Sequence, residues 1–237
     1  MAENSRSSAP RPGATSGESG PLGDRNVSSD FSGPQHISQS SGGHRHPPRQ
    51  IRDPVPSFTG RAAELERLGR MLRTATGAVA LISGVQNLSG IGKTELACKL
   101  AYESQGQFPW QILVELRGQS ESPLRPEQAL ERVIRAFPGG AQRLPQDLEP
   151  LINVYRSLLS GHRVLIVADD ARDANQVKPL LPPPGSALLI TSKNRLFLQG
   201  ASTVHTLELD ALSAPESASL LRALCSRLSS AQAAELS

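Results

Sequence analysis

The run Val79-Ala80-Leu81-Ile82, followed by Ser89-Gly90-Ile91-Gly92-Lys93-Thr94, decides the fold class of this 237-residue chain. The apolar run predicts a strand, the glycine-bearing stretch predicts a turn, and a helix is expected from Lys93 onward. Such a turn directs several backbone N–H groups at a helix N-terminus toward one point, which suits a phosphate. Lys93 adds positive charge for the β- and γ-phosphates, and the Thr94 hydroxyl is suited to Mg²⁺. The stretch therefore predicts a site for a nucleoside di- or triphosphate.

The first glycine of the usual phosphate-loop pattern is missing. In G-x-x-x-x-G-K-[ST] that glycine precedes Gly92 by five positions, where this chain has Asn87. Asparagine tolerates a left-handed backbone better than other non-glycine residues, so the loop can still form. An ordinary turn between a strand and a helix, with Lys93 as a solvated charge, is the alternative, and the rest of the chain has to decide between them.

Composition divides the chain near residue 53. Residues 1–52 contain 11 Ser, 7 Gly and 6 Pro. Few apolar side chains remain, and their burial could not offset the conformational entropy that ordering this segment would cost. We expect residues 1–53 to form a disordered tail, residues 54–230 to form one domain, and residues 231–237 to form a C-terminal tail. Neither a secretory signal nor an 18-residue apolar run is present, so no membrane partner is expected.

Charge and cysteine content also narrow the class of protein. The formal net charge is +3, and two of those charges come from residues 1–52, which leaves the predicted domain nearly neutral. A nucleic-acid partner is therefore not evident. Cys98 and Cys225 form no Cys-x-x-Cys pair, which fits a reducing compartment, and we expect a cytoplasmic protein.

Apolar periodicity predicts alternating strands and helices beyond the glycine turn. Five strands are expected at 78–83, 111–116, 164–168, 187–191 and 206–209, and helices at 61–73, 93–104, 126–137, 148–159, 175–181 and from Ser213 onward. The last helix begins with a capping box, Ser213 to Glu216, and its leucines at 220, 221, 224 and 228 are expected to be buried. The order predicts an α/β fold, a parallel sheet with helices on both faces.

Two acids follow the third predicted strand. Val164–Ala168 runs directly into Asp169 and Asp170, and ligands of such sheets bind beyond the carboxyl ends of the strands. Asp169 could hold Mg²⁺ and Asp170 could orient an attacking water, although two acids that open a turn are the alternative. The fourth strand leads into Lys193, a cation that could contact a γ-phosphate or remain a solvated loop charge.

The combined motifs resemble the signal-transduction ATPases with numerous domains, the STAND class, in its NB-ARC form. Phe58-Thr59-Gly60-Arg61-Ala62-Ala63-Glu64-Leu65 is similar to the opening motif of that class, and the similarity continues through the glycine turn, the acids and Ile190–Lys193. The resemblance implies a three-layer P-loop NTPase fold with strand order 5-1-4-3-2. It also implies that the chain stops before the helical and winged-helix domains of the family.

The resemblance further implies a nucleotide switch, with ADP bound in the off state, ATP bound in the on state, and Mg²⁺ as the metal. The residues that it places around the nucleotide are Phe58, Arg61, Asn87, Leu88, Ser89, Gly90, Ile91, Gly92, Lys93, Thr94 and Glu95. Thr94 and Asp169 would hold the metal, Asp170 would assist hydrolysis, and Lys193 stands where the family has a sensor arginine.

We therefore predict an ATP- or ADP-binding regulatory domain that is at most a slow Mg²⁺-dependent ATPase, with other proteins as its partners. The alternative is a catalytically inactive interaction module that pairs with related full-length switch proteins. A metabolic kinase is disfavoured because no second substrate motif is visible.

Overall fold

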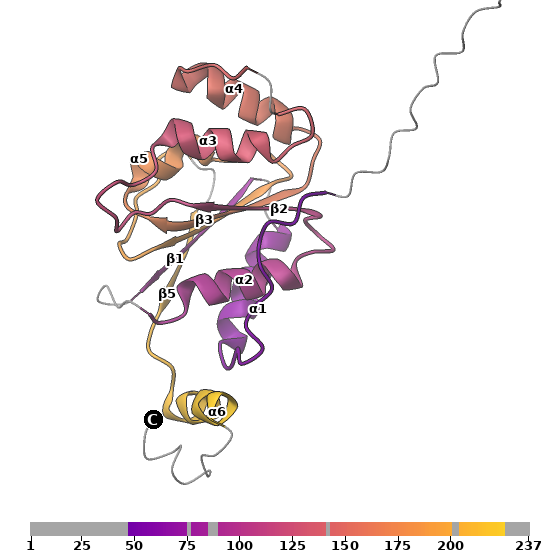
Figure 1. The fold of residues 1–237 in the computed structure, drawn as a ribbon. Coiled ribbons are helices and arrows are strands. Elements are labelled where there is room, and N and C mark those ends of the chain that lie inside the picture. Colours follow the sequence, from indigo (N-terminus) through magenta and orange to yellow (C-terminus); the bar gives the residue numbers. More distant parts are fainter. Residues whose placement is uncertain (1–46, 75–76, 85–89, 141–142, 201–203, 226–237) are drawn as a thin grey trace, which may run out of the picture. The chain divides into compact units, whose positions relative to one another are not determined.

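The fold is seen in a computed structural model, which describes residues 47–74, 77–84, 90–140, 143–200 and 204–225 (Figure 1). Helices and strands alternate along these residues, as the periodicity predicts. In chain order they are α1 (Ala62–Thr74), β1 (Ala78–Gly84), α2 (Lys93–Glu103), β2 (Trp110–Glu115), α3 (Pro126–Arg135), α4 (Leu148–Leu159), β3 (Val164–Ala171), α5 (Ala174–Val177), the 3-10 helix η2 (Lys178–Leu180), β4 (Ala187–Ser192), β5 (Val204–Leu209) and α6 (Ala214–Leu224).

The five strands form one sheet in the order β2-β3-β4-β1-β5, and every pair is parallel. This is the predicted order 5-1-4-3-2 read from the opposite edge, and the predicted three-layer α/β fold is confirmed. β1, which precedes the glycine turn, lies between β4 and the edge strand β5. Strands with helices on both faces are buried on both sides, which explains the unbroken apolar runs of β1, β3 and β4.

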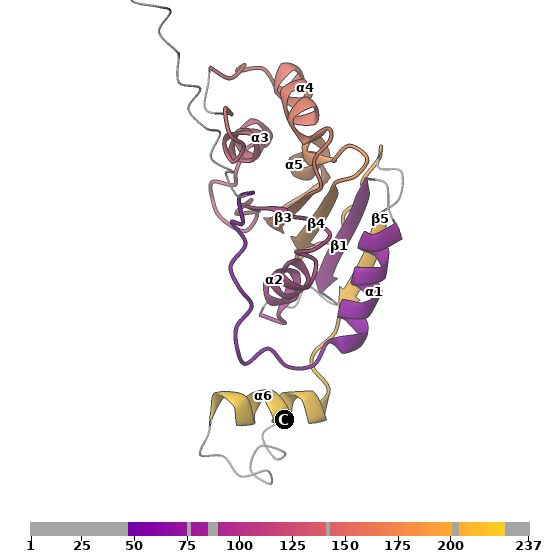
Figure 2. The ribbon, with the colours of Figure 1, turned by 90° about the vertical axis from the view of Figure 1, so that its right-hand side faces the viewer.

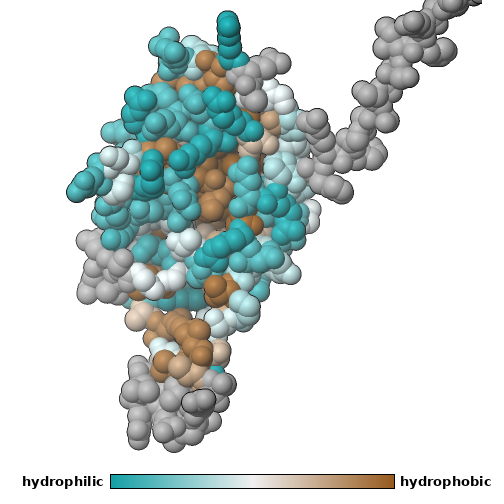
Figure 3. Space-filling view, in the orientation of Figure 1, coloured by the Kyte–Doolittle hydropathy of each residue, from teal (hydrophilic) through white to brown (hydrophobic). Residues whose placement is uncertain are grey.

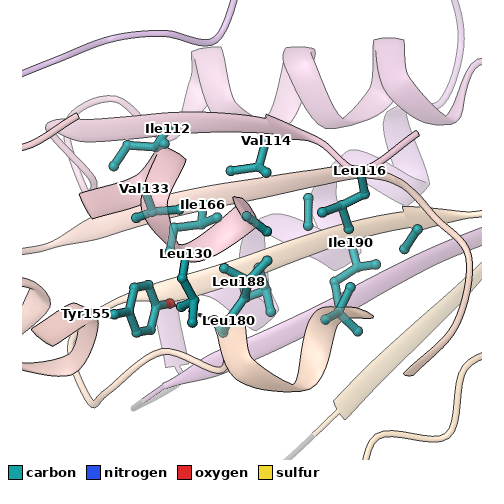
Figure 4. Close-up of a cluster of buried hydrophobic side chains, with 14 of the residues drawn as sticks. Ile112, Val114, Leu116, Leu130, Val133, Tyr155, Ile166, Leu180, Leu188 and Ile190 are labelled. Carbon is teal, nitrogen blue, oxygen red and sulfur yellow. Dashed lines mark hydrogen bonds between the residues drawn. The ribbon is translucent and has the colours of Figure 1, made fainter. Parts of the chain in front are cut away.

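One face of the sheet is covered by α3, α4 and α5, and the other by α1 and α2 (Figure 2). Under α3 and α4, the side chains of Leu130, Val133 and Ile166 pack together, and the Tyr155 hydroxyl donates a hydrogen bond to the carbonyl of Leu180 at 2.6 Å (Figure 4). Under α1 and α2, the opposite side chains of the same strands form a second core. The two cores hold the carboxyl ends of the strands in a fixed arrangement.

The domain begins earlier than the sequence predicts. Ile51 is 5% exposed and belongs to the core under α1 and α2. The segment before it adds backbone hydrogen bonds to β2, because Gln111 N–H donates to Pro48 O and Gln50 N–H donates to Gln111 O. The expected tail of residues 1–53 is therefore wrong for residues 47–53, which pack on the domain.

The apolar stripe of α6 differs from the prediction as well. Leu220 and Leu221 are half-buried and Leu224 is 62% exposed, whereas Leu228 lies outside the described residues. The surface of α6 is therefore largely apolar, as the brown region there in Figure 3 shows. Within the described part of the chain, no helix has the length and apolar character needed to cross a bilayer.

Candidate functional site

Two glycines shape the turn before α2. Gly90 and Gly92 have φ angles of 77° and 91°, in the left-handed region that favours glycine. A Cβ atom built on either glycine would meet no heavy atom of the described residues within 4 Å, so these residues leave space beside the turn. Gly92 is the N-cap of α2, and the N–H groups in the first turn of a helix make no hydrogen bond within the helix itself. The predicted contacts of Asn87, Leu88 and Ser89 lie outside the described residues.

The hydroxyl of Thr94 and the carboxylate of Asp169 meet as the motifs predict. Thr94 Oγ1 donates to Asp169 Oδ1 at 2.8 Å, although 75 residues separate them. Thr191, at the end of β4, donates to the same oxygen at 2.6 Å. Parallel strands end at one edge of the sheet, and this brings the glycine turn, the end of β3 and the end of β4 together.

Asp170 has an unusual backbone. Its φ is 54°, a left-handed value that is rare for a residue other than glycine. Its amide N–H donates to Thr191 Oγ1 at 2.9 Å, and its Oδ2 accepts from the N–H of Gln119 at 3.1 Å. The Gln119 contact is not visible in the sequence, because it joins the loop after β2 to the end of β3, 51 residues later.

Both lysines of the prediction line one cavity. This phosphate cavity has a volume of about 300 Å³, and its lining consists of Gly90, Gly92, Lys93, Thr94, Glu95, Asp170, Thr191, Ser192 and Lys193. Burial of the ammonium lowers the pKa of Lys93, and the charge of Lys193 lowers it further, whereas Asp170 and Asp169 oppose the shift. The two lysines and two carboxylates therefore act on each other at the edge of the sheet.

A second cavity of about 400 Å³ adjoins the first. Its lining consists of Val55, Ser57, Phe58, Thr59, Arg61, Gly90, Ile91, Gly92, Glu95, Ala211, Leu212, Ser217 and Leu220. We call it the nucleoside cavity, because it is less polar than the phosphate cavity and shares Gly90, Gly92 and Glu95 with it. Phe58, Arg61 and Ile91, which the resemblance assigns to the nucleotide, line this cavity, and their contact with a nucleotide stays a prediction. The lining residues from α6 and from the linker between β5 and α6 were not identified from the sequence, because the leucines of α6 were assigned to the core.

Arg61 is 6% exposed and makes hydrogen bonds to the glycine turn, to the segment after β5 and to α6. Its guanidinium donates to the carbonyls of Ile91 and Asp210, at 3.4 and 2.6 Å, and pairs with Glu64 at 2.9 Å. Its backbone N–H donates to Glu216 Oε1 of α6 at 3.2 Å. Arg61 thus fixes the position of the glycine turn relative to α1 and α6.

An ion pair that sequence reasoning missed closes the junction of the cavities. Arg52 pairs with Glu95, and Val55 N–H donates to Glu95 Oε2 at 3.3 Å. The hydrogen bond from Arg52 lowers the pKa of the Glu95 carboxyl. The sequence gives little indication of this ion pair, because Arg52 lies in a stretch whose composition is that of the predicted tail.

The residues present fit Mg²⁺ bound together with a phosphate. Mg²⁺ prefers oxygen ligands and is usually held by one or two carboxylates, substrate phosphates and water. Thr94 and Asp169 supply such oxygens beside an open cradle of backbone N–H groups. Among the residues that the structure describes, no group of three or more His, Cys, Asp or Glu could hold a metal by itself, so the phosphate would complete the set.

A larger hollow of about 850 Å³ shares no lining residue with these cavities. Phe197 and Arg67 border it, and its Arg195 pairs with Glu208. Neither the glycine turn nor Asp170 contributes to its lining.

Comparisons with known proteins agree with this geometry. No protein-family model matches the chain. The regulatory protein AfsR of Streptomyces griseus is 40% identical over 176 residues, which are 73% of this chain and 18% of that protein. AfsR of Streptomyces coelicolor is 40% identical over 179 residues, 72% of this chain and 18% of that protein. The chain thus spans about a fifth of the length of the curated relatives it matches.

The fold also occurs in a solved structure. The ORC2 protein of Aeropyrum pernix, in its ADP form, matches with a TM-score of 0.52 and 21% identity over 79% of this chain and 55% of that chain. A STAND protein with a tetratricopeptide repeat sensor from Pyrococcus horikoshii matches with a TM-score of 0.48 and 21% identity, over 78% of this chain and 28% of that chain. The chain therefore belongs to the family of the AfsR regulatory proteins, and its strand order and glycine turn are those of the P-loop NTPase fold that the resemblance to the STAND class implies.

Proposed function

We propose that this domain binds ADP and ATP with Mg²⁺ and acts as a nucleotide switch in a regulatory protein, with slow or absent hydrolysis. The observation that carries the proposal is that the phosphate cavity and the nucleoside cavity share Gly90, Gly92 and Glu95. One continuous site can therefore receive a polyanion at one end and a less polar base and sugar at the other. The regulatory role is supported by the name of the AfsR relatives.

The charges of the site support a distinction between ATP and ADP. Lys93 and Lys193 both line the phosphate cavity, so an additional phosphate would meet a second cation. Asp170 is held by Gln119 and Thr191, and we propose that it orients water when hydrolysis occurs. An arginine would offer a planar fork at position 193, and a lysine offers a point charge, which favours weaker recognition.

Equilibrium titration with ADP and with Mg-ATP tests the proposal. Lys93→Ala removes a cation from the phosphate cavity, and we expect it to weaken binding at least about tenfold, since hydrogen bonds to charged groups contribute roughly 1.5–3 kcal/mol. Lys99→Ala is the matched control, because Lys99 lies on the same helix, pairs with Glu103 and lines neither cavity. Equal binding by wild type and Lys93→Ala would contradict the proposed site.

A second candidate function is a catalytically inactive interaction module that pairs with related full-length switch proteins. It is favoured by α6, whose Leu224 is 62% exposed and whose other leucines are half-buried. Such a surface can receive another protein. The two functions differ in thermal melting, because a ligand at 100 times its Kd stabilises a protein by about 2.7 kcal/mol. An unchanged melting temperature in millimolar ADP and ATP would favour the interaction module.

A further inference from the structure

β3 contains a bulge between its apolar run and its two acids. Ala168 is opposite Ile190 of β4, and the next pair is Ala171 opposite Ser192, so Asp169 and Asp170 together face one residue, Thr191. In a regular strand, consecutive side chains point to opposite faces of the sheet. A bulge re-aims them, and here Asp170 takes up the extra residue with its left-handed φ of 54°. Both acids act on Lys93 as a result.

At the bulge, the backbone N–H of Asp170 finds its hydrogen-bond acceptor in the side-chain hydroxyl of Thr191. The N–H of Asp170 donates to Thr191 Oγ1 at 2.9 Å, and the same hydroxyl donates its proton to Asp169 Oδ1 at 2.6 Å. Thr191 is 2% exposed, so its hydroxyl is largely shielded from solvent. A polar group buried without a partner is costly, so this hydroxyl helps to keep the bulge in its observed form, together with the hydrogen bond from Gly118 N–H to Asp170 O at 2.7 Å.

We propose that Thr191 is the positioning residue for the magnesium site: its single hydroxyl orients the carboxylate of Asp169 and holds the backbone turn that presents Asp170. The inference rests on the proposed nucleotide-binding function and names a residue that controls its metal dependence. Thr191 touches the two acids, and its influence on the metal passes through them. Residues that orient metal ligands typically change metal affinity by 10–100-fold when they are mutated.

The side chain of Ser186 provides a matched control at the other end of β4. Its hydroxyl is also buried and also joins β3 to β4, because it accepts from Val164 N–H at 3.2 Å and donates to His162 O at 3.1 Å. It lines neither cavity. Ser186→Ala therefore removes a comparable bridge between the strands without touching the acids.

The first measurement is the ratio of ADP affinity in excess Mg²⁺ to ADP affinity in EDTA, by titration calorimetry. Thr191→Val keeps the shape and removes the hydroxyl, so we expect the ratio to fall about tenfold. Thr191→Ser restores the hydroxyl and should stay within about threefold of wild type. Ser186→Ala should lower the melting temperature and leave the ratio unchanged. Thr191→Cys, with a weak donor and acceptor, is a milder second variant if the valine protein does not fold.

The second measurement needs no nucleotide. Hydrogen exchange at the Asp170 amide should be slow in wild type and Thr191→Ser and fast in Thr191→Val. An unchanged magnesium ratio in Thr191→Val, an equal fall in Ser186→Ala, or equal exchange at Asp170 in all variants would each overturn the inference. If wild type binds no nucleotide in either buffer, the proposed function fails, and the Asp170 exchange rates alone then decide whether Thr191 holds the bulge.

Discussion

Lys93 and Lys193 place two like charges in one small cavity, and this arrangement has a cost without a ligand. Burial lowers the pKa of Lys93 and so does Lys193, whereas the two acids partly compensate. A polyanion that enters the cavity would relieve this repulsion. At the scale of single residues, the electrostatics of the two lysines therefore support the proposed phosphate site.

Substitution of Lys193 tests the sensor assignment. We expect Lys193→Ala to reduce ATP affinity about tenfold and ADP affinity much less, because a hydrogen bond to a charged phosphate contributes roughly 1.5–3 kcal/mol. Lys193→Arg keeps the charge and adds a planar fork, so it should bind ATP at least as well as wild type. Arg195→Ala is the control, since Arg195 pairs with Glu208 and lines neither cavity of the site. Competition between ATP and ADP for a fluorescent ADP analogue measures the ratio, and an equal loss for both nucleotides would rule out the sensor role.

At the scale of elements, one carboxylate caps two helices. Glu216 Oε2 accepts from the N–H and the hydroxyl of Ser213 at the start of α6, at 3.0 and 2.7 Å, and Oε1 accepts from Arg61 N–H before α1. The approach is close: a Cβ atom on Gly60 would lie 2.5 Å from Glu216 Oε1. Gly60 has a φ of 74°, so its missing side chain serves both the turn and this contact.

The capping contact predicts a pH dependence of stability. Its hydrogen bonds, first from the Ser213 hydroxyl and then from the Ser213 and Arg61 amides, lower the pKa of Glu216 below its ordinary value. The carboxylate therefore stabilises the fold above the pKa of about 4.3 of an unfolded glutamate, and the contribution disappears as the pH falls through the lower folded pKa. Glu216→Gln should melt below wild type at pH 7, by an amount near the roughly 1 kcal/mol of a helix cap, and the two curves should converge near pH 3.

Thermal melting by circular dichroism between pH 3 and pH 7 measures this difference. Glu66→Gln serves as the control, because Glu66 lies 3.9 Å from Arg70 on the exposed surface of α1 and such pairs contribute little. A constant difference between wild type and Glu216→Gln across the pH range would contradict the capping role.

The elements themselves follow closely from local sequence, and their contacts across the chain do not. Val164–Ala168 predicts a strand because it is apolar on both faces, but the strand continues to Ala171 through a bulge that depends on Thr191, more than twenty positions away. The capping box at Ser213 is a local pattern and is confirmed, whereas the contact of Glu216 with Arg61 spans 155 residues. Periodicity identifies the apolar face of α6, but it carries no information about what covers that face.

At the scale of the whole molecule, a segment with the composition of the tail is part of the domain. Composition averaged over 52 residues hides Ile51, which is buried, and Arg52, which pairs with Glu95 at the junction of the two cavities. The segment passes from the edge of β2 to Val55 and Phe58 in the nucleoside cavity. We therefore infer that residues 47–58 link the edge of the sheet to the nucleotide.

Two shortened chains test this link. A chain that begins at residue 47 keeps the segment, and we expect its melting temperature to stay within about 2 °C of the full chain, a shift below 1 kcal/mol for a protein of this size. A chain that begins at residue 57 loses the burial of Ile51, about 1.5–3 kcal/mol, together with two backbone hydrogen bonds to β2. It should melt about 5 °C lower or more and bind ADP more weakly, because it lacks Val55 and the partner of Glu95. Ile51→Ala in the full chain removes the burial alone and should lower the melting temperature while ADP binding is kept. Equal melting and equal ADP binding by the two shortened chains would show that residues 47–56 contribute neither to the core nor to the site.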